Sequence, residues 1–223
     1  MGQRSQIYIR YNVNYVVGSK TNNPSVSNFH GFIARYFQWN YGERMISRAR
    51  GIIEAIHDEY MEYPFLWGEQ RCVEKMRRMC DVNFDMRDIM ISSDILAEVA
   101  EYCDGDLSYI FNQDNNDGQL LIDVTDKMIK YCFIDGTGDT TPMDGDAYMK
   151  WQMNDEDNPD ADWRVPTQYL KKSTINYTDK NIKKINRLAR LMTIDEVRSF
   201  ITADYSTYIP NLTSTTEEVI DEG

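Results

Sequence analysis

The sequence predicts an α+β domain whose mostly antiparallel sheet, built from an N-terminal hairpin and a mid-chain meander, packs against several amphipathic helices. Three observations support this fold class. Residues 6–13 alternate between the two faces expected of a strand. Apolar residues recur at helical spacing over 46–56 and again in the C-terminal third. Strand-like segments return between 108 and 134, where turn residues separate them.

The N-terminal part is predicted as a hairpin followed directly by a helix. Residues 6–13 and 30–39 read as strands, and strands so close in the chain most simply pair with each other. Asn40 fits the N-cap of the following helix, and Glu43 lies three residues later, which is the spacing of a capping box. Residues 29–56 are therefore the expected strand-to-helix scaffold.

The mid-chain meander consists of segments 108–112, 119–124 and 127–134, with Asp117-Gly118 at one tight turn. Thr193 and Glu196 form a second capping box. Helices are expected over five further segments: 69–80, 93–103 with a cap at Ser92 or Ser93, 144–153, 178–192 and 194–204.

Composition indicates a single domain over residues 1–210, followed by a flexible acidic tail over 211–223. A hydrophobic content of 42% in 223 residues is enough for a sizeable core. The four cysteines form no C-x-x-C pair, and two histidines do not make a zinc pattern. We expect no metal and no cofactor. Neither a signal peptide nor a membrane-spanning run is visible, so a cytoplasmic location is expected.

Charge is distributed unevenly along the chain. The net charge is −12, yet the segment 98–162 alone carries 17 Asp and Glu against 3 Lys and Arg, a net of −14. Such a segment repels nucleic acid and attracts a basic protein surface. The alternative is that these acids lie on solvated loops and only aid solubility. The predicted binding surface comprises Asp104, Asp106, Asp114, Asp117, Asp135, Asp139, Asp144, Asp146, Asp155, Glu156 and Asp157.

A second candidate is a small-ligand site at the strand-to-helix junction over residues 35–50. Exposed amides at a helix start favour an anion, and arginines from neighbouring strands would add positive charge if they point to the same side. The ligand would be a small anionic nucleotide that is bound, stored or turned over. The structural alternative is that Asn40 caps the helix and the aromatic residues cover its start. The residues of this candidate are Arg10, Arg35, Gln38, Trp39 and Arg44.

Weaker patterns point to cations. Residues 114–118, DNNDG, are similar to a calcium-binding loop, but two essential ligands are missing, so a turn is favoured. The acidic run 135–146 offers four carboxylates to a magnesium ion. No phosphate-binding loop, dinucleotide fingerprint or hydrolase motif occurs, and the sequence favours a binding protein over an enzyme.

The segments GQRSQIYIRYN and IARYFQWNYGERMISRARGIIE, with FNQDNNDG, YMKW and LMTIDEVRSFI further on, resemble an uncharacterised family carried by phages and prophages of Gram-positive bacteria. The resemblance covers most of the chain and brings no known reaction with it. It implies an accessory protein of mobile DNA. By analogy with anti-CRISPR proteins, the partner would be a host or defence protein with a basic surface, without direct contact to nucleic acid or membrane.

Overall fold

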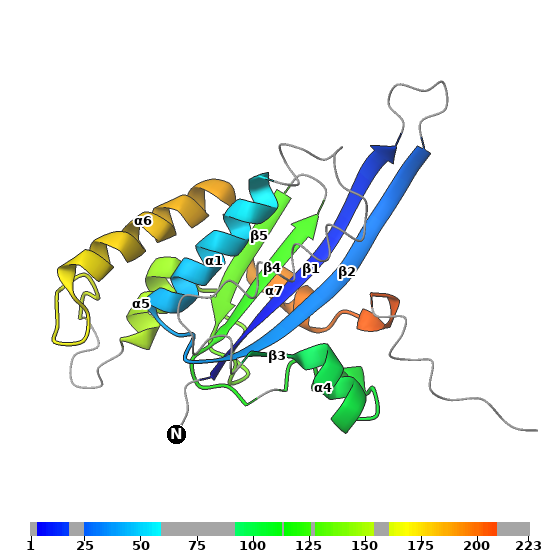
Figure 1. Ribbon diagram of the computed structural model, residues 1–223, viewed down its shortest axis with the longest axis horizontal. Helices are drawn as coiled ribbons and strands as arrows, with labels where there is room; N and C mark the ends of the chain where they lie inside the picture. Colours follow the sequence, from blue (N-terminus) through cyan, green and yellow to red (C-terminus); the bar gives the residue numbers. More distant parts are fainter. Residues whose placement is uncertain are drawn as a thin grey trace, which may run out of the picture.

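A six-stranded sheet lies between two layers of helices (Figure 1) in the computed structural model. The structure describes residues 4–17, 25–58, 92–112, 114–125, 128–153 and 161–208. The strands, in the sheet order β3-β2-β1-β4-β5-β6, are β1 (Arg4–Val17), β2 (Ser25–Gln38), β3 (Ser92–Asp94), β4 (Gln119–Thr125), β5 (Met128–Ile134) and β6 (Arg190–Leu191). The helices are α1 (Glu43–Ile56), α4 (Ile95–Tyr102), α5 (Gly145–Gln152), α6 (Lys172–Leu188) and α7 (Ile194–Ile201), with short 3-10 turns η2 (Leu107–Tyr109) and η3 (Tyr205–Thr207).

The sheet is mixed, so the expectation of a mostly antiparallel sheet is wrong, although α and β elements combine as predicted. The pairs β1–β2, β2–β3 and β4–β5 are antiparallel. The central pair β1–β4 is parallel, and so is β5–β6. Parallel neighbours need a long crossover between them, and the chain between β1 and β4 supplies it.

The N-terminal hairpin is confirmed and is longer than predicted, because β1 and β2 pair from Arg4↔Gln38 to Val17↔Ser25. In Figure 1 the two strands project beyond the ends of β4 and β5. The predicted strands 119–124 and 127–134 are also confirmed as β4 and β5. In the sheet, β4 lies directly beside β1, and β5 pairs with the other edge of β4.

The predicted strand 108–112 and the turn after it are wrong. The carboxylate of Asp106 accepts a hydrogen bond from the Ser108 N–H at 2.9 Å and starts η2 instead. Asp117-Gly118 does not join two antiparallel strands. Asn115 Oδ1 accepts from the main-chain N–H groups of both residues, at 3.2 and 2.9 Å, and Gly118 has a φ of 89°. This turn leads into β4, which runs parallel to its neighbour β1. A two-residue hairpin turn joins only antiparallel strands.

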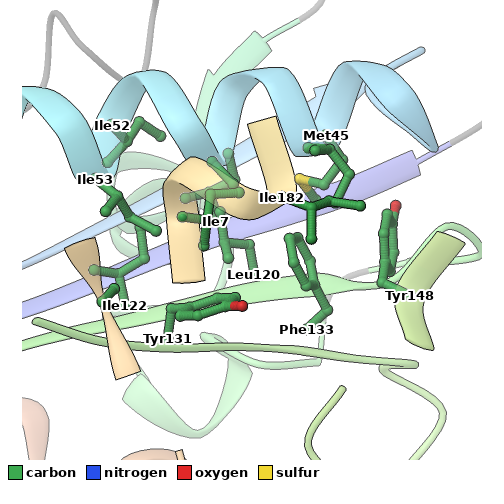
Figure 2. Close-up of a cluster of buried hydrophobic side chains, with 14 of the residues drawn as sticks. Ile7, Met45, Ile52, Ile53, Leu120, Ile122, Tyr131, Phe133, Tyr148 and Ile182 are labelled. Atoms are coloured by element: carbon green, nitrogen blue, oxygen red, sulfur yellow. The ribbon is translucent and has the colours of Figure 1, made fainter. Parts of the chain in front are cut away.

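The larger core fills the space between the sheet and the helices α1, α5 and α6. Figure 2 shows side chains of α1 pointing onto the sheet. Alternate residues of each strand face this core, because successive side chains in a strand point to opposite sides. Its labelled members are Ile7, Met45, Ile52, Ile53, Leu120, Ile122, Tyr131, Phe133, Tyr148 and Ile182.

The opposite face of the sheet carries an aromatic core under α4, α7 and the two 3-10 turns. Phe32 and Tyr205 have ring centroids 4.1 Å apart, and Tyr8 and Phe111 lie 4.6 Å apart. The Tyr8 hydroxyl donates to the carbonyl oxygen of Ile110 at 2.9 Å, which satisfies its buried polar atom. Both faces of β1 are therefore buried over residues 5–9.

Asn40 does not cap α1, contrary to the prediction. The N-cap is Gly42, with a φ of 52° and no side-chain hydrogen bond to the helix. The Asn40 side chain is buried instead: its Oδ1 accepts from Arg48 Nε at 3.0 Å, and its Nδ2 donates to Ser5 Oγ at 3.2 Å. Arg48 is only 1% exposed, and its guanidinium lies over the Phe37 ring at 4.4 Å. Asn40 thus links β1 to α1.

The other helix boundaries follow local side chains. Asp94, and not Ser92 or Ser93, caps α4 by accepting from the Leu96 and Ala97 N–H groups. The capping box of Thr193 and Glu196 is confirmed. Helix α6 begins at Lys172, earlier than predicted. The predicted helix 69–80 and the tail 211–223 lie outside the described residues.

One substitution at Asn40 distinguishes its buried role from a helix-capping role. Serine is as good an N-cap as asparagine, so a capping role predicts that Asn40→Ser is neutral. We expect Asn40→Ser to lower the free energy of unfolding by about 1–3 kcal/mol, because serine does not reach Arg48 and Ser5 together. Urea unfolding checks this. The same change at exposed Asn176 is the control, and a neutral result at Asn40 would restore the capping interpretation.

Candidate functional site

Part of the predicted acidic surface belongs to loops near one end of the sheet, where β1 and β4 begin and β2 and β5 end. In Figure 1, α4 and the loops that precede β4 and follow β5 lie at this end. Two of these loops touch, since Asn115 Nδ2 donates to the Asp135 carbonyl oxygen at 3.0 Å. We call this region the acidic end and define it by the carboxylates of Asp104, Asp106, Asp135 and Asp139.

The acidic end keeps its negative charge available. Within the described part of the chain, none of its four carboxylates forms an ion pair. A hydrogen bond from the Ser108 main chain lowers the pKa of Asp106, and one from the Thr141 hydroxyl lowers that of Asp139. The Asp135 carboxylate accepts from the Thr137 N–H at 2.9 Å and from its hydroxyl at 2.7 Å. These short-range bonds hold three of the carboxylates in fixed positions.

Other predicted members of the acidic surface bind groups of the protein itself. Asp114 pairs with Arg4, and Asp144 caps α5 by accepting from the Ala147 N–H at 2.8 Å. Asp146 contacts Arg164, which also binds Asp179 at 3.1 Å. Asp155, Glu156 and Asp157 lie outside the described residues. The acidic segment is therefore only in part a surface available to a partner.

Asp117 is buried at the acidic end, with 5% of its surface exposed. Its main-chain oxygen accepts from the Tyr148 hydroxyl at 2.9 Å and from Gln152 Nε2 at 3.0 Å. Its carboxylate Oδ2 and the buried Gln6 Oε1 have no hydrogen-bond partner. Burial raises the pKa of Asp117 to about 6, because the charged form loses its hydration.

The alternative ligand site does not assemble, because Arg10 and Arg35 lie on opposite faces of the sheet. Arg10 pairs in register with Phe32, a member of the aromatic core, whereas Arg35 pairs with Ile7 of the larger core. Phe32 and Arg35 are three residues apart in β2, and residues an odd number of positions apart in a strand point to opposite faces of the sheet. Arg35 lies 3.9 Å from the Asp94 carboxylate.

Arg10 instead starts a row of charges that crosses four strands. Both its Nε and a terminal nitrogen donate to the Asp123 carboxylate at 3.0 Å. Lys130 follows in register, 3.9 Å from Asp123 and 3.2 Å from Glu196 of α7. Arg190 closes the row with two bonds to Glu196, which hold the pKa of that carboxyl at about 2. The row fixes α7 to the sheet, and its cations are engaged.

The remaining residues of the alternative site shape the turn from β2 to α1. Trp39 has a φ of 61°, in the left-handed region, and its side chain is 36% exposed. Its carbonyl oxygen accepts from an Arg44 guanidinium nitrogen at 3.1 Å. Gln38 is the last residue of β2. The junction is thus a strand-to-helix turn whose polar groups bind each other.

The structure does not support the proposed cation ligands. Among the described residues, no group of three or more His, Cys, Asp or Glu side chains is placed to hold a metal ion. Asn115 of the calcium-like loop accepts from the main chain of its own turn. No helix in the described ranges has the length and apolar character needed to cross a membrane.

Several polar residues were not found from the sequence. Gln6 is buried, and Asp123 and Lys130 belong to the row of charges that Arg10 starts. Asp117 was predicted as a member of an exposed acidic surface, and it is buried. The signal that could have identified Asp123 is its position between apolar residues in the strand QLLIDVT. Its partner Arg10 follows only from the register of two strands more than a hundred residues apart.

No known protein family, curated protein or solved structure matches this chain. Its function is therefore inferred from the chemistry of its own surfaces.

Burial of Asp117 predicts a pH-dependent stability. Its pKa is raised from 3.8 to about 6, so between these values the folded chain holds a proton that the unfolded chain has lost. Stability therefore falls as pH rises through this window and stays lower above it. We expect Asp117→Asn to increase the unfolding free energy by about 3 kcal/mol at pH 7 and to flatten this dependence. Thermal unfolding from pH 4 to 7 measures both.

The control for this prediction is Asp195→Asn, because Asp195 is exposed at the start of α7. It should leave the slope of stability against pH unchanged. An Asp117→Asn variant that keeps the wild-type slope would show that Asp117 is ionised normally in the folded chain.

Proposed function

We propose that this chain is a non-enzymatic accessory protein of phage origin that binds a host defence protein, such as a CRISPR-Cas effector, and inhibits it. The acidic end would occupy the basic groove in which that partner binds nucleic acid. The observation that carries this proposal is the set of four exposed or half-exposed carboxylates without ion pairs at one end of the sheet. Such an array can take the place of backbone phosphates opposite Lys and Arg.

The rigidity of the acidic end favours such binding. Asp106, Asp135 and Asp139 each accept hydrogen bonds from the residue two positions later, so their loops are held before a partner arrives. A surface that is already ordered loses less conformational entropy on binding. The negative potential of the −12 chain also accelerates the approach of a basic partner, and this effect weakens as salt increases.

The quadruple variant Asp104→Asn, Asp106→Asn, Asp135→Asn and Asp139→Asn tests this proposal. Wild-type protein, immobilised and incubated with lysate of a Gram-positive host carrying an active CRISPR system, should retain a basic nucleic-acid-binding protein that elutes with salt. We expect the quadruple variant to bind the purified partner at least tenfold more weakly, because each charge-assisted contact is lost. It should also fail to block the partner's binding of nucleic acid.

A matched control changes the net charge by the same four units away from the acidic end, through Asp58→Lys and Asp195→Lys. This control should bind and inhibit like the wild type. If neither added salt nor the quadruple substitution changes the partner's affinity, the acidic end is not its binding surface.

A further inference from the structure

Helix α6 and the residues beside it carry a concentration of positive charge, although the chain as a whole is acidic. Residues 171–190 contain seven Lys and Arg and a single Asp, in a chain with a net charge of −12. In Figure 1, α6 lies at the outer side of the helical layer, beside α1. Its apolar residues, among them Ile175, Ile182 and Ile185, are buried. The opposite side of the helix therefore faces solvent along its whole length.

Four cations form one row on this exposed side. Lys172, Lys180, Lys183 and Arg187 are all exposed. At 3.6 residues per turn they fall within one narrow sector, opposite the buried isoleucines, and Ser173 and Asn176 share that sector. From Lys172 to Arg187 the row extends about 22 Å along the axis, at 1.5 Å per residue. We call this row the basic face of α6.

Most of this charge is not neutralised by the protein itself. Asp179 binds both Lys183 and Arg164, and Lys184, to the side of the row, lies 3.1 Å from Glu54 of α1. Within the described ranges, Lys172, Lys180 and Arg187 form no ion pair with any carboxylate. Three cations on one line thus remain available to an anionic ligand.

Aromatic and polar groups flank the row. Tyr177 on α6 is 53% exposed, and Tyr169, shortly before the helix, is 85% exposed. An open groove of about 590 Å³ lies at the C-terminal end of α6, where Asn186, Arg187 and Arg190 line it together with Met128 and Leu191. Asp144 also borders this groove, but its carboxylate is engaged as the cap of α5.

These features favour nucleic acid over a protein partner. Lysine is depleted in protein–protein interfaces, yet three of the four cations here are lysines. Phosphate groups are bound by Lys and Arg together with Ser and Asn side chains, which is the composition of this row. Exposed tyrosines stack on unpaired bases. We infer that the basic face of α6 binds the phosphate backbone of single-stranded nucleic acid, with Tyr169 and Tyr177 against its bases.

The acidic composition does not oppose this inference. Charges that are separated by more than about 8 Å are largely screened at physiological salt, so the local surface decides what binds. The expectation of no direct contact with nucleic acid rests on the acidic segment 98–162, which does not include α6. The basic face shares no residue with the acidic end, so the inference stands apart from the proposed function.

The direct test is fluorescence anisotropy with a labelled thymidine oligonucleotide of about 20 nucleotides, which is longer than a typical single-strand binding site. The full chain should bind it, and the logarithm of the binding constant should fall with the logarithm of salt at a slope of about −2 to −3. This slope corresponds to three or four phosphates at about −0.7 each. A chain that fails to bind at 50 mM salt, or that binds without salt dependence, overturns the inference.

A matched pair of variants locates the binding surface. Lys180→Gln with Arg187→Gln removes two cations of the basic face, and Lys150→Gln with Arg198→Gln removes two exposed cations elsewhere. The first variant should bind at least tenfold more weakly and lose about 1.4 from the salt slope. The second should match the wild type. Equal losses in both variants would mean that no particular face binds, and the inference fails.

Substitution of the two tyrosines tests whether bases stack on this surface or whether the ligand is bound by charge alone. Tyr169→Ala with Tyr177→Ala should weaken binding of the single strand by about fivefold or more, while binding of a duplex of the same length stays unchanged. Poly-glutamate of equal charge should compete poorly. An unchanged affinity in the tyrosine variant, or full competition by poly-glutamate, would show a general anion surface, such as one for an acidic protein, and would overturn the assignment to single-stranded nucleic acid.

Discussion

The alternation of side chains along β1 is the constraint on which the rest of the structure depends. Ile7, Ile9 and Tyr11 enter the larger core, while Tyr8 enters the aromatic core on the other side. Because β1 pairs with both β2 and β4, a shift of its register by one residue would exchange the contents of both cores. Helices must therefore cover both faces, and the three-layer architecture follows from this one strand.

Polar residues that look available in the sequence are largely used to hold these layers together. Arg48 and Asn40 join α1 to the start of β1 through Ser5, and Arg10 with Asp123 joins the two central parallel strands. A buried charge is tolerated only when it is paired and hydrogen-bonded, so each of these groups is positioned by its partners. Arginine near a helix start is for this reason weak evidence of a ligand site.

Acidic loop residues and the basic residues of α6 lie in different regions of the surface. Asp104, Asp106, Asp135 and Asp139 lie in loops near one end of the sheet, whereas the exposed lysines belong to α6, at the outer side of one helical layer. Loops follow the ends of strands, so acids at several places in the chain come together once the sheet forms. A basic helix whose apolar side is buried exposes its cations in one row. A protein of this kind presents two surfaces of opposite sign.

The sequence by itself determined the N-terminal hairpin, the strands β4 and β5, the helix after the hairpin and the capping box of α7, because these depend on periodicity and on neighbouring residues. Of the acidic surface it identified the residue types, but not which carboxylates stay unpaired. Tertiary structure alone decided the parallel pairing of β1 with β4, the opposite orientation of Arg10 and Arg35, and the buried positions of Asn40 and Asp117. The physical reason is that strand register and burial arise from contacts between residues far apart in the chain, which leave no pattern in the local sequence.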